Sequence, residues 1–129
     1  MFYSSTTDSF VIQREVESGS SANGRYVRYA DGTMICESRR NGTARGGANT
    51  IQYAWTYPSA FTGTIPTVTV TLDADSVYAA GWNVTDMYTI MAQAVNNTGA
   101  VGYMTPLGQS TASNYTVTVA DMVAVGRWY

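Results

Sequence analysis

Short runs in which hydrophobic and polar residues alternate recur along the chain, and this period of two is typical of β-strands. The clearest run, residues 51–57, has Ile, Tyr, Trp and Tyr at every second position and stops at Pro58. Residues 67–72 alternate threonine with Val or Leu. Shorter or less regular runs predict further strands at residues 10–16, 84–95, 100–104 and 115–125.

Two of these runs need a further argument. Residues 84–95 also fit helical spacing, but their Thr, Tyr, Ile and Val content favours a strand. In the last run, Asp121 interrupts the apolar positions and indicates a bulge. Polar or glycine-rich loops are expected at residues 17–24, 38–49, 73–83 and 105–114. The expected fold class is therefore all-β, an antiparallel β-sandwich of about six to eight strands.

The segment around Asp31 and Gly32 predicts a β-hairpin, because Asp-Gly is a strong signal for a two-residue turn. With that loop length, Val27 lies opposite Cys36. The face expected to point into the core carries Val27, Tyr29, Met34 and Cys36. The opposite face carries Tyr26, Arg28, Ile35 and Glu37. This mixed face is either solvated or in contact with another subunit, where Tyr and Arg are enriched.

Composition limits the classes of protein to consider. The 129 residues suffice for one domain with a modest core. Only 12% of the residues are charged, so uncharged polar side chains must provide most of the polar surface. All seven basic residues are arginines and the net charge is −2, which argues against a nucleic-acid partner.

The chain has no sequence feature of a small disulfide-bonded protein or of a membrane-inserted protein. Its single cysteine, Cys36, cannot form an intramolecular disulfide and is expected to be a core thiol. No apolar stretch is long enough to span a bilayer, and the N-terminus lacks the regions of a signal peptide. We expect a soluble chain without membrane insertion and without an export signal of its own.

The side chains of the common catalytic and metal sites are missing. There is no histidine, hence no Ser-His-Asp triad and no imidazole ligand. The carboxylates of Asp73, Asp75 and Asp86 could cap loops, contact a cation or a sugar, or act as a pair in glycoside hydrolysis. Capping is the more frequent use of loop Asp, so we expect no catalytic residue, no metal, no cofactor and no enzymatic activity.

Aromatic residues in polar surroundings are the strongest candidates for a binding site. Such rings offer a flat apolar surface to a sugar, and neighbouring Asn and Asp side chains can bond its hydroxyls. The candidate receptor- or carbohydrate-binding residues are Tyr78, Trp82, Asn83, Asp86, Tyr88, Asn96 and Asn97. In the alternative interpretation, Trp82 and Tyr88 only close the ends of the sandwich.

Three stretches of the chain carry motifs in a fixed order. Residues 22–38, ANGRYVRYADGTMICES, combine a glycine, an aromatic strand, an Asp-Gly turn and Ile-Cys. Residues 53–72, YAWTYPSAFTGTIPTVTVTL, contain Trp-Thr-Tyr-Pro, Phe and Pro-Thr-Val. Residues 124–129, AVGRWY, contain Gly-Arg-Trp. Together these stretches resemble the C-terminal tip domain of bacteriophage tail fibres.

The resemblance implies a small β-sandwich that forms a homotrimer at the end of the fibre and binds a receptor on the bacterial surface. This sandwich is also similar to that of the H-type lectins, which are trimeric and hold sugars near subunit boundaries. The chain has no histidine and no clear counterpart of their sugar-contacting residues, so no lectin site is transferred to it. Residues 1–21 would be a lead-in with the first strand, joined to a fibre shaft, and residues 22–129 the tip domain.

A three-fold axis could use side chains on faces that the core does not occupy. The candidate trimer-interface residues are Tyr26, Arg28, Ile35 and Trp128. The leading hypothesis is the tip of a virion's distal tail fibre, made in the host cytoplasm, which binds a host-surface glycan or outer-membrane protein during adsorption. The alternatives are a structural trimerisation cap of the fibre, a free-standing H-type-like lectin, and an enzyme that degrades surface polysaccharide.

Overall fold

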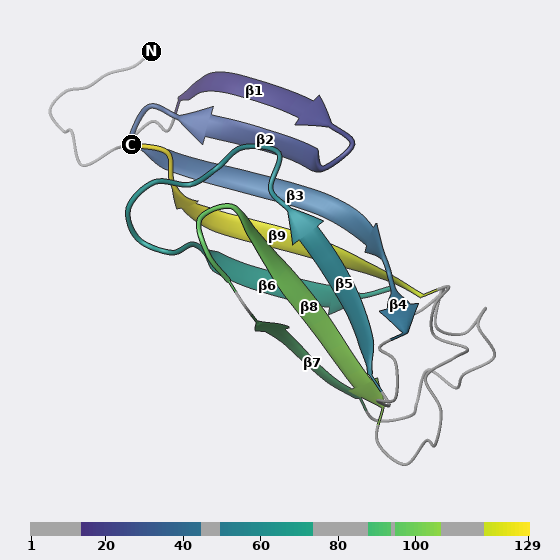
Figure 1. Ribbon diagram of the computed structural model, residues 1–129. Coiled ribbons are helices and arrows are strands. Elements are labelled where there is room, and N and C mark those ends of the chain that lie inside the picture. The colour runs from purple at the N-terminus through teal and green to yellow at the C-terminus, as the bar shows by residue number, and fades with distance from the viewer. Residues whose placement is uncertain (1–13, 45–49, 74–87, 94, 107–117) are drawn as a thin grey trace, which may run out of the picture.

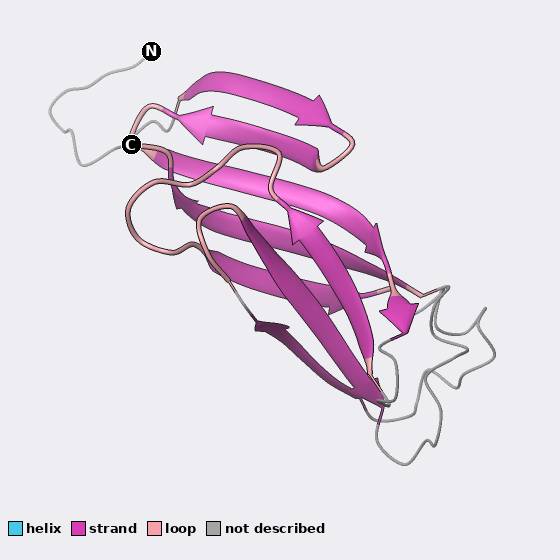
Figure 2. Cartoon of the chain, viewed as in Figure 1, coloured by secondary structure: helices cyan, strands magenta, loops and turns pink. Residues whose placement is uncertain are grey.

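The computed structural model describes residues 14–44, 50–73, 88–93, 95–106 and 118–129, and the regular elements in these ranges are all strands (Figure 2). The strands are β1 (Glu15–Ser21), β2 (Gly24–Tyr29), β3 (Thr33–Asn41), β4 (Thr43–Ala44), β5 (Ile51–Thr56), β6 (Thr67–Leu72), β7 (Tyr88–Gln93), β8 (Gly99–Pro106) and β9 (Val119–Arg127). The alternating runs at residues 51–57, 67–72 and 100–104 correctly predicted β5, β6 and β8.

Two antiparallel sheets lie face to face and enclose the core (Figure 1). One has the order β1-β2-β3-β9-β6 and the other the order β4-β5-β8-β7. The largest fully buried side chains are Tyr53, Met34, Ile51, Met104, Met122, Thr118 and Cys36. The Tyr53 and Thr118 hydroxyls lie 2.6 Å apart and satisfy each other inside this apolar layer. The expected antiparallel β-sandwich is confirmed.

The two ends of the sandwich differ in what they carry (Figure 1). At the end that we call the terminal end, the Ala30 amide donates to the Arg14 carbonyl (2.7 Å) and the Trp128 amide donates to the Gly32 carbonyl (3.0 Å). The first described residue and the C-terminus therefore lie together. At the opposite end, the loop end, the Asp73 amide donates to the Val119 carbonyl (2.9 Å). Segments 45–49, 74–87 and 107–117 all join described strands there.

The hairpin formed by β2 and β3 has a different register from the one predicted. Tyr26 pairs with Cys36 and Arg28 pairs with Met34, so the loop has three residues instead of two. Gly32 has a φ of 93°, a left-handed conformation that a three-residue hairpin loop uses at this position. A shift of one residue moves each side chain of β2 to the other face of the sheet.

The shifted register corrects the predicted faces of the hairpin. Met34 and Cys36 are buried, as expected, but Val27 and Tyr29 point away from the core. Tyr26 takes their place and packs against the core from β2. The prediction of Val27 and Tyr29 as core residues was therefore wrong.

Residues 17–21 and 38–41 were predicted as loops but belong to strands. β1 covers Glu15–Ser21, and β3 continues to Asn41. β1 is an edge strand with mostly exposed side chains, so it has no apolar face that a periodic pattern could detect. Its six residue pairs with β2 hold it in the sheet through backbone hydrogen bonds.

The apolar alternation in the last strand pointed to the wrong face. The buried residues of β9 are Ala120, Met122 and Ala124, whereas Val123 and Val125 face outward. No bulge occurs at Asp121, which pairs in register with Arg39 on one side and Thr71 on the other. The irregularity in the five-stranded sheet lies in β1, between Glu15 and Glu17.

The buried thiol makes stability sensitive to alkaline pH. Burial raises the pKa of Cys36 from 9.0 to about 11, although a backbone hydrogen bond at Ser59 and the charge of Arg28 lower it. The contribution that the buried, protonated thiol makes to the free energy of unfolding is fully present below pH 9, and it is lost as the pH rises through 11. A shift of this size corresponds to about 3 kcal/mol.

We therefore expect the free energy of unfolding to fall between pH 9 and 11, and to fall less in Cys36→Ala. Denaturant titrations of both proteins at a series of pH values measure the difference. Burial also raises the pKa of Tyr57 to about 12, so Tyr57→Phe serves as the comparison for the decline above pH 10. Parallel pH curves for the wild type and Cys36→Ala would contradict the prediction.

Candidate functional site

The predicted aromatic binding site falls mostly on segments outside the described residues. Tyr78, Trp82, Asn83 and Asp86 lie in one such segment, and so does Asp75, a candidate for cation, sugar or catalytic contact. Tyr88 begins β7 and pairs with Pro106 at the loop end. The assignment of these residues to a binding site stays a prediction.

Asn96 and Asn97 lie at the other end of the sandwich, in the turn between β7 and β8. The Asn96 side-chain oxygen accepts hydrogen bonds from the amides of Thr98 (2.8 Å) and Gly99 (3.0 Å). The side-chain amide of Asn97 donates to the Gly63 carbonyl (3.1 Å). The structure therefore does not bring these two residues together with Tyr88, and it gives both a role in holding the turn.

Three of the four predicted trimer-interface residues meet within one chain. The Arg28 guanidinium lies 5.3 Å from the centre of the Tyr26 ring and 5.2 Å from that of Trp128, which are cation–π distances. Arg28 also pairs with Glu17 and donates to the Ser59 hydroxyl (2.8 Å). This cluster fastens β1 and β2 to the C-terminus and to the segment after β5.

The side chains of the C-terminal residues, which include the Gly-Arg-Trp motif, hold the C-terminus against the hairpin turn through hydrogen bonds. The Trp128 indole donates to the Tyr29 carbonyl (2.9 Å), and the Arg127 guanidinium donates to the Asp31 carbonyl (2.9 Å). The Tyr129 hydroxyl donates to the Ala30 carbonyl (2.7 Å). These bonds satisfy carbonyls of a turn that has few backbone partners, so this motif has a structural role at the terminal end.

Ile35, the fourth candidate, lies on the outer face of the five-stranded sheet. The pairing places Val27, Ile35, Val125 and Thr67 side by side across four strands. Three of these side chains are aliphatic, and Val125 is 42% exposed. We call this set the aliphatic row.

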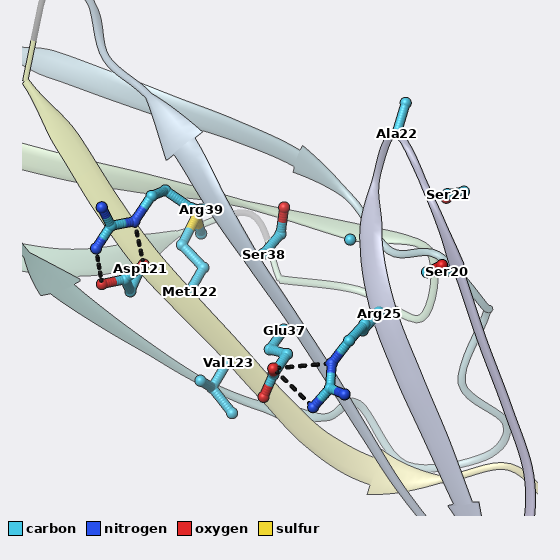
Figure 3. A pocket seen from close by; sticks show the side chains of 11 residues that line it. Ser20, Ser21, Ala22, Arg25, Glu37, Ser38, Arg39, Asp121, Met122 and Val123 are labelled. Carbon is cyan, nitrogen blue, oxygen red and sulfur yellow. Dashed lines mark hydrogen bonds and ion pairs between the residues drawn. The ribbon is translucent and has the colours of Figure 1, made fainter.

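Beside the aliphatic row, toward the loop end, lies an open groove of about 540 Å³ (Figure 3). Its wall on one side is the turn between β1 and β2, and its floor is formed by β3 and β9. The groove is lined by Ser20, Ser21, Ala22, Gly24, Arg25, Glu37, Ser38, Arg39, Asp121, Met122 and Val123.

The charged residues of the groove are paired (Figure 3). The Arg25 guanidinium contacts Oε1 of Glu37 twice, at 3.0 and 3.1 Å. Arg39 forms a two-pronged pair with Asp121, at 2.9 and 3.1 Å, and also contacts Asp73 at 3.3 Å. The hydrogen bond and the charge of Asp121 raise the pKa of Arg39 above its usual value.

The turn that forms the wall of the groove is held by β5 of the opposite sheet and by Arg40 of β3. The Trp55 indole donates to the Asn23 carbonyl (2.8 Å), and Arg40 donates to the carbonyls of Ala22 (3.3 Å) and Ala54 (3.1 Å). Gly24 has a φ of 113°, and a Cβ there would lie 2.2 Å from the Glu37 carbonyl oxygen. The turn thus depends on the absence of a side chain at Gly24.

The sequence pattern does not reveal this groove. Arg39 was placed in a loop and Asp121 was interpreted as a bulge, and 82 residues separate the two. The only signal in the sequence is that Arg39 and Asp121 carry opposite charges. Without knowing the register of the two strands, this signal is too weak to predict that the two side chains form an ion pair.

Two searches of the described residues concern metal-ligating groups and membrane-spanning helices. Within them, no three His, Cys, Asp or Glu residues are grouped so that they could hold a metal ion. A search of the same ranges finds no helix of the length and hydropathy that a membrane span requires. The groove, with its paired charges and hydroxyls, is suited to hydrogen bonding.

No known protein-family model matches the chain, and no curated protein matches it in sequence. Two solved structures are similar in fold. A fragment of the R1 pyocin fibre of P. aeruginosa, comprising C-terminal residues 323–701, aligns with a TM-score of 0.59 and 21% identity over 86% of this chain and 28% of the fragment. An N-truncated R1-type pyocin tail fibre aligns with a TM-score of 0.56 and 20% identity over 86% of both chains. The chain therefore shares its fold with the C-terminal part of a tail fibre and spans just over a quarter of the longer fragment.

Proposed function

We propose that the chain is the distal domain of a phage-type tail fibre and binds a receptor on the surface of a host bacterium. Two findings support this proposal: the shared fold with pyocin tail-fibre fragments and the order of the three tail-fibre motifs. The receptor is a surface glycan or an outer-membrane protein. The domain acts by binding alone, so incubation with host polysaccharide should release no reducing sugar.

One feature of the fold carries the proposal. Arg14, within the proposed lead-in and first strand of residues 1–21, accepts a hydrogen bond from Ala30 in the hairpin turn at the terminal end, and Trp128 donates to Gly32 in the same turn. A fibre shaft joined through the lead-in would attach at that end. The loop end would then point away from the shaft, toward the cell. Segments 74–87 and 107–117 both join strands there, and the first of them contains Trp82 (Figure 1).

A double substitution of Trp82 and Tyr88 by alanine is expected to abolish binding of the fluorescently labelled domain to host cells. Replacing both rings removes the flat surface on which we place the receptor, where each ring contributes about 1–3 kcal/mol. Flow cytometry on a panel of Gram-negative strains, with purified lipopolysaccharide as competitor, measures the loss.

Tyr129→Ala is the matched control, because Tyr129 is an exposed aromatic residue at the terminal end. It should leave cell binding unchanged. Unchanged binding by the double variant would show that these two residues do not contact the receptor. If the wild-type domain bound no strain but formed trimers, the structural trimerisation cap would be favoured instead.

We also propose that three copies assemble. Weak single sites gain by roughly 10² to 10⁴ in avidity when several engage one surface. The aliphatic row around Ile35 is the outer surface best suited to contact another copy, since its neighbouring charges are already paired within the chain. Light scattering should give three times the chain mass of 13.9 kDa. A monomer at micromolar concentration would contradict the assembly.

A further inference from the structure

We infer that the groove between the β1–β2 turn and strands β3 and β9 binds a neutral segment of a bacterial surface glycan. This inference rests on the proposed function and extends it, because it adds a second contact to the receptor and names its chemical class. Four properties of the groove support it: position, size, charge balance and the hydrogen-bonding groups that remain available.

The groove is close to the end where we place the receptor. Arg39 in its lining contacts Asp73, the last described residue before segment 74–87. A ligand in the groove would therefore lie at the base of the segment that contains Trp82.

The size of the groove matches a short oligosaccharide. Its volume of about 540 Å³ lies within the usual range for small-molecule sites, about 300–1,000 Å³. The groove is open to solvent, so a longer chain could continue out of it. An open site of this kind is suited to an internal segment of a polymer.

The charges that line the groove cancel. Arg25 is paired with Glu37, and Arg39 is paired with Asp121. Arg25 contacts Glu37 through only part of its guanidinium, but an anionic ligand that used the remaining N–H donors would lie beside the Glu37 carboxylate, and a cationic ligand would lie beside a guanidinium. A neutral ligand meets neither repulsion, so the balance favours uncharged sugars over acidic sugars, phosphates and nucleic acid.

Several hydrogen-bonding groups in the groove remain available to a ligand. Both contacts from Arg25 reach Oε1 of Glu37, so Oε2 can accept bonds from sugar hydroxyls. Among the described residues, the Ser20 hydroxyl makes no hydrogen bond within the chain, and the pairing places Ser20 in one cross-strand row with Arg25 and Glu37. The methyl groups of Val123 lie beside Glu37 and can contact the C–H edges of a sugar ring.

The test uses the full chain on an array of neutral and acidic bacterial oligosaccharides, followed by titration of the best neutral oligosaccharide by calorimetry. We expect retention of neutral oligosaccharides. Glu37→Gln should weaken the titrated affinity by about tenfold, because a charged acceptor is lost. Ser20→Trp should abolish binding by filling the groove from an exposed edge strand.

Two matched controls test the location of the site. Glu15→Gln removes the same charge from β1 at the terminal end, and Val16→Trp adds the same ring to β1 away from the groove. Both should bind as the wild type does. Retention of acidic oligosaccharides only, retention of none, or equal affinities for the groove variants and the wild type would overturn the inference.

Cell labelling separates this inference from the proposed function. If the wild type labels host cells and the Ser20→Trp variant labels them equally, the groove is not a receptor contact and the proposed function stands. If the wild type labels no strain, the proposed function fails. Binding of a neutral oligosaccharide that Ser20→Trp abolishes would then still support a glycan site.

Discussion

Replacing Trp55 by alanine is expected to lower the free energy of unfolding by about 4 kcal/mol. The side chain is 3% exposed and packs between the two sheets. Its ring makes an edge-to-face contact with Tyr57, with 5.0 Å between the ring centres, and its indole holds the Asn23 carbonyl. The substitution would leave a large cavity and free the turn that forms the wall of the groove. Denaturant titration measures the loss.

Trp55→Phe separates packing from hydrogen bonding. It keeps most of the ring contacts but leaves the Asn23 carbonyl without its donor, so we expect a loss of about 1–2 kcal/mol. If the glycan proposal is correct, this variant should also bind neutral oligosaccharide more weakly than its stability alone explains, because the turn is less well fixed. An alanine variant that lost no more stability than the phenylalanine variant would show that Trp55 contributes little packing.

Gly24→Ala is expected to cost about 3 kcal/mol, which is large for one added methyl group. The φ of 113° is unfavourable for any residue with a Cβ, and the new Cβ would lie 2.2 Å from the Glu37 carbonyl oxygen. Backbone atoms cannot move aside as a flexible side chain can. The hairpin of β1 and β2 would have to separate from β3, and the melting temperature would fall accordingly.

Gly63→Ala provides the control for this prediction. Gly63 also has a positive φ, 73°, but nothing lies within 4 Å of the position of its Cβ. It should therefore cost only the conformational strain, about 1 kcal/mol. Equal losses for the two variants would mean that the close approach of Gly24 to β3 is unimportant.

The sequence was informative where a strand has one buried face and one exposed face. In β5, for example, Tyr53 and Trp55 are buried and Ala54 between them is exposed, so the alternation is clear. In β9 both faces carry apolar residues, and the small side chains of Ala120 and Ala124 take the core positions. Hydrophobicity alone then selects the wrong face, because the larger valines dominate the pattern.

Register and pairing were the information that the sequence lacked. The Asp-Gly signal located the hairpin, but the loop uses three residues, and that difference of one exchanged Tyr26 for Val27 on the core face. The groove depends on the same information, because Arg39 and Asp121 meet only when β3 and β9 are correctly aligned. Tyr78 and Trp82 could be chosen from the sequence as binding residues, and that choice still depends on the cell-binding experiment.

The orientation of β1 has a mechanical consequence. If a shaft is joined before Arg14 and the loop end holds a cell, tension would pull on β1 along its own axis. The hydrogen bonds between antiparallel strands lie perpendicular to the strands, so this tension loads them in shear. The six pairs between β1 and β2 would then share the force instead of breaking one after another. An exposed polar edge strand would thus anchor the domain against detachment of the particle.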